Sequence, residues 1–283
     1  MARMAANSSI SPERPVLELS GPKLRIAFET LVNASEAVGG IEQFVAAVKL
    51  KSKVFQDLLG EGKADTVVRA EFEQLVQLMA TVRRRLKRLV DDQGWPKVRE
   101  AIAALIEDAA DTANADKTVA AFVKTFPDVR EYRFTRDLAA EILHNAMPEH
   151  YPLMQRWVWD TKTNSGVIRE IWHGDDVDHM VIDIADGYET FLVLREELSQ
   201  FLSDNGVFRD MLWHVDLLCA QVYGDYINAQ GGAWLKTEFG SDSDPLEHTR
   251  RIIGLDRVAG KRPGKSGTID GTAETVLPTK LLS

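Results

Sequence analysis

Cysteine is almost absent from the sequence: Cys219 is the only one among 283 residues. This excludes an internal disulfide framework and any zinc or iron–sulfur site built from several thiolates. Cys219 falls on an apolar helical stripe, so we expect a buried and unreactive thiol. Because a chain without disulfides suits a reducing compartment, we expect a cytoplasmic protein.

Long hydrophobic runs are also missing. No stretch of about 18 uninterrupted apolar residues occurs, so we expect neither a membrane-spanning helix nor a membrane partner. No basic segment followed by an apolar run precedes the first helical pattern, and we expect no secretory signal. The sequence contains no P-loop, dinucleotide glycine fingerprint, G-x-S-x-G elbow or H-E-x-x-H motif, which leaves open whether the protein is an enzyme.

Charged residues are plentiful but unevenly distributed. The formal net charge is −9. Residues 22–90 contain 12 Lys or Arg and 8 Asp or Glu, whereas residues 91–255 contain 15 and 30. The acidic part disfavours nucleic-acid binding by the chain as a whole, because phosphate groups repel it. The basic part is suited to an acidic partner or to the acidic part of the same chain.

Helical periodicity predicts a mainly α protein. Four segments follow from composition and pattern: a disordered tail over 1–21, a basic helical hairpin over 22–90, an acidic helical body over 91–255 and a disordered tail over 256–283. In the hairpin, a helix over 40–59 precedes an apolar seam with coiled-coil-like spacing. The seam consists of Val68, Phe72, Leu75, Met79, Val82, Leu86 and Leu89. We expect one continuous seam helix that buries against the helix over 40–59 or against a second copy of the chain.

The region around 156–184 differs from the helical pattern. Runs rich in Trp, Val and Ile over 156–160, 167–172 and 180–184 alternate with turn residues. This alternation is typical of short strands separated by turns. We therefore expect a small antiparallel β meander within the helical body, although the middle run also fits a helical turn.

A cluster of imidazole and carboxylate side chains follows the middle run. These are the ligand types that a divalent transition metal accepts. The cluster consists of His173, Asp175, Asp176, Asp178 and His179. An Asp-rich turn in solvent has the same composition without any metal, and we favour this second interpretation.

Two further groups are candidate sites. The first is a candidate aromatic-walled pocket near two prolines. Its residues are His144, His150, Tyr151, Arg156, Trp157 and Trp159. The alternative, which we favour, is that these aromatics fix a loop to the core and find backbone hydrogen-bond partners. The second group is a run of cations at the end of the seam, suited to a phosphate group, a nucleic acid or an acidic protein face. It consists of Arg83, Arg84, Arg85, Lys87 and Arg88. The alternative, which we favour, is solvent exposure or internal pairing with the acidic part of the chain.

The sequence favours a non-enzymatic accessory, adaptor or regulatory protein that acts through protein–protein contacts. Its partner would be another protein or a second copy in a homodimer. The first alternative is a metal-dependent, hydrolase-type enzyme that uses the cluster at 173–179. The second alternative is a nucleic-acid-binding protein that uses the cations at 83–88.

Overall fold

The computed structural model describes residues 14–60, 62–235 and 246–257. These residues form eleven α-helices and no named strand, which confirms the mainly α prediction. The helices are α1 (Gly21–Glu36), α2 (Ile41–Leu59), α3 (Arg69–Gln77), α4 (Arg83–Gln93), α5 (Trp95–Asp108), α6 (Ala115–Lys124), α7 (Thr135–Ala146), α8 (Val167–Glu170), α9 (Tyr188–Asp204), α10 (Met211–Leu235) and α11 (Glu247–Ile252). Within these ranges, none is both long and apolar enough to cross a membrane.

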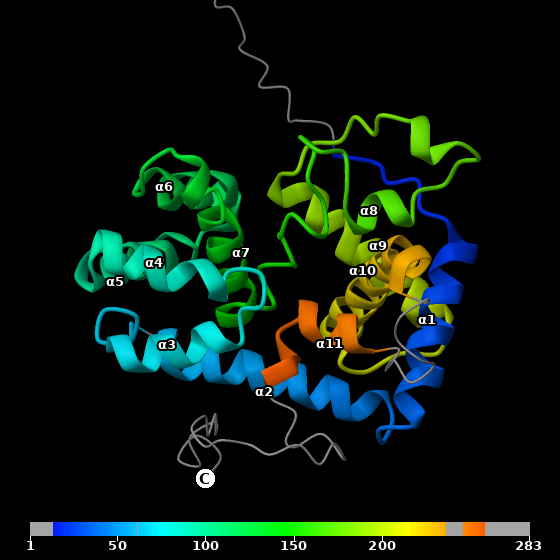
Figure 1. Cartoon of the computed structure of the whole chain (residues 1–283), viewed down its shortest axis with the longest axis horizontal. Helices are drawn as coiled ribbons and strands as arrows, with labels where there is room; N and C mark the ends of the chain where they lie inside the picture. The colour runs from blue at the N-terminus through cyan, green and yellow to red at the C-terminus, as the bar shows by residue number, and fades with distance from the viewer. Residues whose placement is uncertain (1–13, 61, 236–245, 258–283) are drawn as a thin grey trace, which may run out of the picture.

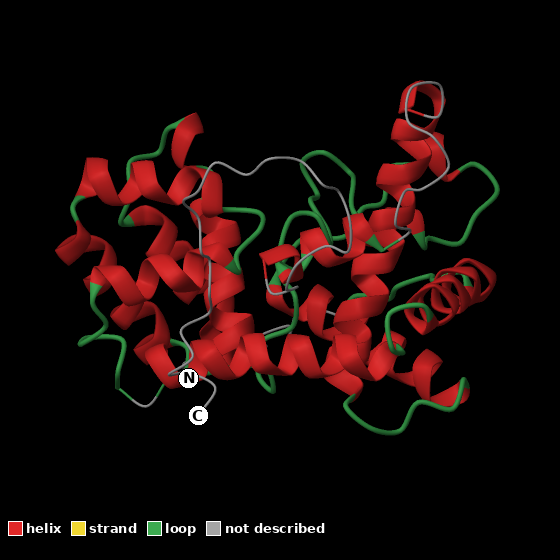
Figure 2. Cartoon of the chain, turned by 60° about the horizontal axis from the view of Figure 1, so that its bottom comes forward, coloured by secondary structure: helices red, strands yellow, loops and turns green. Residues whose placement is uncertain are grey.

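The helices form two groups, which α2 and α7 join (Figures 1 and 2). Helices α3 to α6 lie on one side, α1 and α8 to α11 lie on the other, and α2 runs along the lower edge beneath both in Figure 1. Every residue of α7 except Arg136 is buried. A helix that is buried all round must pair its polar side chains internally. This requirement governs the chemistry of Asp137, Glu141 and His144.

The apolar seam is buried, but the prediction of one continuous seam helix is wrong. The chain leaves the helix at Leu78 and re-enters one at Arg83. The bend lies where the end of α11 packs: a Cβ added to Gly254 would lie 1.8 Å from the Leu78 carbonyl oxygen. Only a glycine permits this close backbone approach, and the φ of Gly254 is +77°. Apart from the exposed Val68, all seam residues belong to the hydrophobic core of this chain.

The predicted β meander around 156–184 does not form. The described residues of this region contain only two isolated bridges, Asp160 with Ser165 and Leu19 with Trp172, and the run over 167–172 forms the short α8. The run over 180–184 is held instead by a side chain. The Asn164 amide donates to the Met180 carbonyl at 2.9 Å and accepts from the Ile182 N–H at 3.1 Å. These bonds replace the strand ladder that the alternating pattern predicts.

The inner ends of both predicted tails pack against the folded chain. The Ser20 N–H donates to the Ile171 carbonyl at 2.8 Å, and the His173 N–H donates to the Glu18 carbonyl at 2.8 Å. At the other end, Asp256 pairs with Arg83. The remainder of the tail predictions, over 1–13 and 258–283, lies outside the described residues.

Candidate functional site

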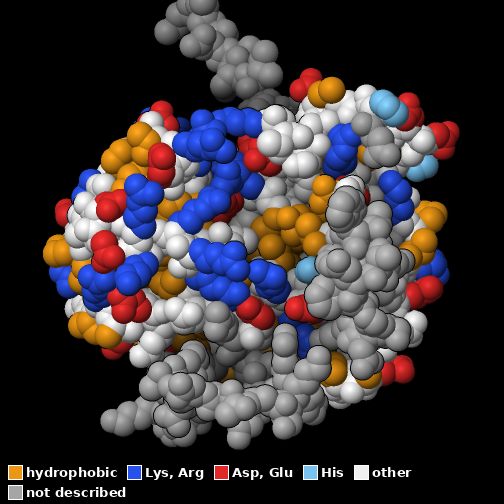
Figure 3. Space-filling model, viewed as in Figure 1, with side chains coloured by type: hydrophobic (Ala, Val, Ile, Leu, Met, Phe, Trp, Pro, Cys, Tyr) orange, Lys and Arg blue, Asp and Glu red, His pale blue; other side chains and the backbone are white. Residues whose placement is uncertain are grey.

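The arginine groove is a surface hollow of about 500 Å³. It is lined by Arg85, Arg130, Glu131, Arg133 and Arg156. These residues come from three places: α4, the 3-10 turn Arg130–Tyr132 before α7, and the turn after α7. Four guanidinium groups and one carboxylate give the lining a formal charge of +3. Figure 3 shows Lys and Arg side chains gathered over this part of the molecule, on the side of α4 and of the segment that leads into α7.

Helix α4 presents Arg85 at the groove because its opposite face is anchored. Leu86, Leu89 and Val90 are buried, so the charged residues between them project outward. The Arg85 side chain is exposed and has no hydrogen-bond or ion-pair partner among the described residues. It is therefore available to a ligand.

The turn that carries Arg130 and Arg133 is fixed by the residue between them. Tyr132 is buried, and its hydroxyl donates to the Asp92 carboxylate at 2.7 Å, just beyond the exposed cations of α4. This hydrogen bond, with a further contribution from Arg88, holds the pKa of Asp92 below its usual range. The flanking Arg130 and Arg133 are exposed and, within the described part of the chain, unpaired. Tyr132 thus aligns two free guanidinium groups along α4.

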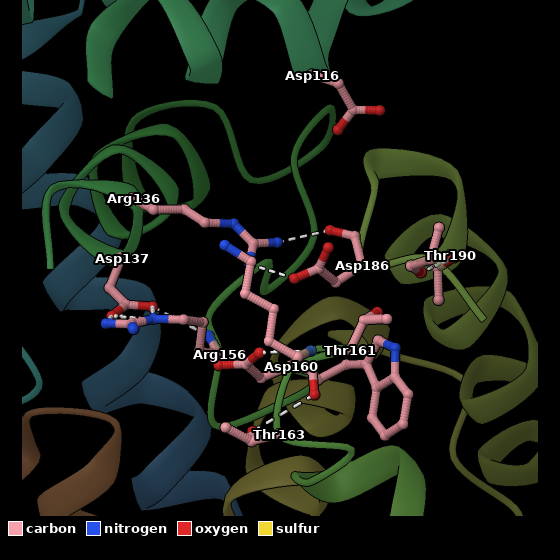
Figure 4. Close-up of polar contacts among 12 residues, drawn as sticks. Asp116, Arg136, Asp137, Arg156, Asp160, Thr161, Thr163, Asp186 and Thr190 are labelled. Carbon is pink, nitrogen blue, oxygen red and sulfur yellow. Dashed lines mark hydrogen bonds and ion pairs between the residues drawn. The ribbon is translucent and has the colours of Figure 1, made fainter. Parts of the chain in front are cut away.

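Arg156 enters the groove in a fixed orientation. Asp137, buried in the first turn of α7, accepts hydrogen bonds at 3.0 Å from the Arg156 backbone N–H and at 3.0 Å from its Nε, and a third from Nη2 (Figure 4). This clamp raises the pKa of Arg156 and leaves Nη1 without a partner among the described residues. The neighbouring Arg136 is held similarly by Asp186. Asp137 is therefore a positioning residue for the groove.

The structure divides the predicted basic run. The Arg83 side chain is only 12% exposed and makes two hydrogen bonds to Asp256, at 2.8 and 2.5 Å. Arg88 pairs with Asp92 at 3.2 Å, and Arg84 and Lys87 are exposed. Of the five cations predicted as a partner-binding site, Arg85 alone lines the groove.

Sequence analysis missed Arg130 and Arg133. The available signal was a local cluster of three arginines within "REYRFTR", which covers residues 130–136. Because residues 130–134 lie between two helical patterns, helical periodicity does not show which surface of the protein their arginines face.

A second group of polar side chains lies inside the protein, where α2, α7 and α10 meet. Lys51 and Glu141 form an ion pair at 2.5 Å, and their side chains are 5% and 4% exposed. Lys51 also donates to the Ile253 carbonyl at 2.9 Å, while Glu141 accepts from Asn145 at 3.3 Å and from Gln155. Each charged group thus has at least two hydrogen-bond partners, as burial requires.

His144 and Asp216 continue this internal group. His144 Nε2 lies 2.9 Å from Asp216 Oδ2, and its Nδ1 lies 2.9 Å from the Tyr151 carbonyl oxygen. Burial alone would lower the pKa of His144, but the charge and hydrogen bond of Asp216, with the Tyr151 carbonyl and Glu141, raise it above the usual value. The adjoining cavity measures about 10 Å³, which is room for about one water molecule and not for a substrate.

The six residues of the predicted aromatic pocket have different surroundings. Arg156 lines the arginine groove, His150 is exposed, and His144 and Trp157 line the small closed cavity. The Tyr151 hydroxyl donates to the Ala109 carbonyl at 2.8 Å. Similarly, the indole N–H of Trp159 donates to the Ile184 carbonyl at 3.0 Å. These buried aromatics fix the loop after α7 to the core.

Four of the five predicted metal ligands at 173–179 have described side chains, and these lie on an exposed turn. Among the described residues, no three His, Cys, Asp or Glu side chains are placed to hold a metal ion. His179 Nδ1 lies 2.6 Å from Asp176 Oδ1, but both side chains are mostly exposed, and His173 and Asp175 are exposed as well. The side chain of Asp178 lies outside the described part.

Cys219 is buried on α10, and burial raises the pKa of its thiol far above the usual value. A thiolate nucleophile is thereby disfavoured at this position.

The chain matches no protein-family model, and comparison with curated proteins and with solved structures finds no match to it. The case for a function therefore depends on the geometry of the arginine groove.

Proposed function

We propose that the protein binds nucleic acid through the arginine groove, with the sugar–phosphate backbone as the recognised group. One observation carries the proposal: Arg85, Arg130 and Arg133 converge on one groove and have no carboxylate partner among the described residues. Since a guanidinium group forms paired hydrogen bonds to phosphate oxygens, such a cluster suits successive phosphates.

The overall acidity of the chain does not decide against this function. At physiological salt the Debye length is about 8 Å, so exposed charges farther than this from the groove are largely screened. The lining residues of the groove have a formal charge of +3, and the Asp137 carboxylate in contact with Arg156 reduces the local charge to +2. Local charge governs the approach of a ligand, whereas net charge mainly affects solubility and long-range repulsion. We accordingly expect weak binding at high salt and clear binding at low salt.

An acidic protein face is the competing ligand, and it corresponds to the accessory or adaptor role that the sequence favours. Two features support the phosphate backbone instead. The cations come from three separate segments and line a concave surface, which fits a continuous row of anions. In addition, Arg156 is held by Asp137 with one guanidinium nitrogen left free, which suits a positioned phosphate contact.

The test measures the affinity of the purified protein for fluorescently labelled oligonucleotides between 50 and 200 mM salt. The logarithm of the affinity should fall linearly with the logarithm of the salt concentration, by about 0.7–0.9 per phosphate contact. Arg133→Ala should weaken binding to every sequence and lower this slope by about one. The matched control is Arg25→Ala on α1, an exposed arginine outside the groove, which should bind as the wild type does.

Two results would refute the proposal. One is the absence of oligonucleotide binding at 50 mM salt. The other is tighter binding of a polyglutamate peptide than of an oligonucleotide with the same number of charges, which would identify the groove as a site for an acidic protein.

A further inference from the structure

A second hollow, the α10–α11 pocket, has a volume of about 250 Å³. It is lined by Ala80, Thr81, Tyr223, Ile227, His248, Arg251 and Ile252. The aliphatic side chains and the Tyr223 ring provide apolar walls. The Thr81 hydroxyl, the His248 imidazole and the Arg251 guanidinium provide polar groups. This mixture suits a flat, partly polar molecule such as a nucleobase.

Two features place the α10–α11 pocket near residues of the arginine groove. Thr81 lies in the turn before α4 and precedes Arg85 by four residues in the chain. The Trp157 ring, which follows Arg156 in the chain, packs against the Tyr223 ring with centroids 5.5 Å apart. On the face shown in Figure 3, exposed apolar surface borders the basic region.

The Thr81 hydroxyl is an independent observation at this pocket. Its Oγ1 is the one buried side-chain oxygen or nitrogen in the described residues that lacks a hydrogen-bond partner. Buried hydroxyl groups are nearly always paired, so an unpaired one needs an explanation. The Tyr223 hydroxyl and the His248 ring likewise have no partner within the described ranges. Three hydrogen-bonding groups of one pocket therefore have no partner among the described residues.

From this we infer that the α10–α11 pocket binds a single unpaired base, and that the ligand of the protein is a single-stranded nucleic acid. The inference depends on the proposed function of the arginine groove. The phosphates would lie along the arginines, and one base would turn into the pocket against Tyr223. Thr81 and His248 are placed to hydrogen-bond its edge. A base within a duplex is stacked and paired, so it cannot enter without being flipped out.

The test compares three labelled probes with equal numbers of phosphates in the probe strand: a single strand, an abasic single strand, and the same strand in a duplex. The full-length wild-type protein should bind the base-bearing single strand about ten-fold more tightly than the abasic one, a ratio within the range for a base stacked on an aromatic side chain. Arg133→Ala should weaken binding of both single strands.

Tyr223→Leu and Thr81→Val should remove the preference for the base-bearing strand without changing the affinity for the abasic one. Thr81→Val keeps the shape of the side chain and removes only the unpaired hydroxyl, so the melting temperature should stay the same or rise. The matched control is Thr30→Val on α1, because the Thr30 hydroxyl already has a partner: it donates to the Ile26 carbonyl at 2.8 Å. This control should keep the wild-type preference.

The outcomes separate the inference from the proposed function. Equal affinity for base-bearing and abasic strands, with both still weakened by Arg133→Ala, would overturn the base pocket and leave the arginine groove as a backbone-binding site. Tighter binding of the duplex than of the single strand would overturn the single-strand inference. A lack of binding to all three probes would refute the arginine groove and the base pocket together.

Discussion

The buried ion pair between Lys51 and Glu141 permits a sharp test of how the core is stabilised. Glu141→Gln removes the negative charge and keeps the size of the side chain. The Lys51 ammonium then stays buried with the Ile253 carbonyl as its remaining strong acceptor. Removing one partner of a buried pair leaves an uncompensated charge, which costs about 3–5 kcal/mol of folding free energy. At about 2–4 °C per kcal/mol, the melting temperature should fall by about 6 °C or more.

The assay is urea unfolding followed by far-ultraviolet circular dichroism. The control is Glu73→Gln. Glu73 is the i,i+4 ion-pair partner of Arg69, and the Glu73 side chain is 53% exposed. An exposed pair of this kind contributes at most about 1 kcal/mol. If Glu141→Gln also falls within about 1 kcal/mol of the wild type, the assignment of Lys51 and Glu141 as a stability-determining pair is refuted.

A double variant tests the same reasoning from the opposite side. Lys51→Met with Glu141→Leu removes both charges and replaces them with apolar side chains of similar volume. Because the desolvation cost disappears with the charges, this variant should be clearly more stable than Glu141→Gln. A double variant as unstable as the single one would show that the loss arises from packing and not from the unpaired ammonium.

Three further predictions concern stability and binding. Burial lowers the pKa of His144, but Asp216 outweighs this effect, so the pKa is raised in the folded state. The interaction of protonated His144 with Asp216 therefore stabilises the fold fully below pH 6.5, and this contribution is lost as the pH rises through the folded-state pKa. Wild-type stability should therefore decline above pH 6.5 in urea titrations, and that decline should be smaller in His144→Gln. Leu75→Ala should cost about 2–5 kcal/mol without changing the mass in solution by light scattering, because the seam is buried within the chain; a change of mass would show a dimer contact. Arg83→Ala should lower stability by about 1–3 kcal/mol through its lost carboxylate partner, whereas Arg85→Ala should lower oligonucleotide affinity and leave stability within about 0.5 kcal/mol. The reverse pattern would contradict the assignment of these two arginines.

The seam shows which part of the fold could be predicted from the sequence. The apolar spacing identifies Phe72, Leu75 and Leu86 as core residues, and the structure buries all three. The same spacing does not reveal the break between α3 and α4. That break reflects the approach of Gly254 to the Leu78 carbonyl, a contact between residues far apart in the chain. Local periodicity records which face is buried, but not whether the helix continues.

The failed prediction of a β meander has a related cause. Trp and β-branched residues over 156–184 are largely buried, as residues of strands would be. The first two runs make backbone hydrogen bonds within turns and α8, such as Val167 N–H to the Trp157 carbonyl at 3.1 Å, whereas the last run pairs with side chains. The Arg169 guanidinium donates to the carbonyl oxygens of Met180 and Val177, at 3.1 and 2.7 Å. A hydrophobic pattern indicates which residues are buried. Whether their backbone groups pair with a neighbouring strand or with polar side chains depends on polar residues that the pattern does not include.

Helix α4 explains why charges that are adjacent in the sequence do not share one surface. Successive residues of an α-helix are about 100° apart around its axis, so Arg83 and Arg85 flank the buried face of α4 on opposite sides. Arg83 therefore meets Asp256 beyond α11, and Arg85 faces the turn that carries Arg130. Charges adjacent in sequence are thus separated in space, and charges from separate segments converge. The cationic site of this acidic chain depends on tertiary packing, which brings α4 and two connecting turns to one groove.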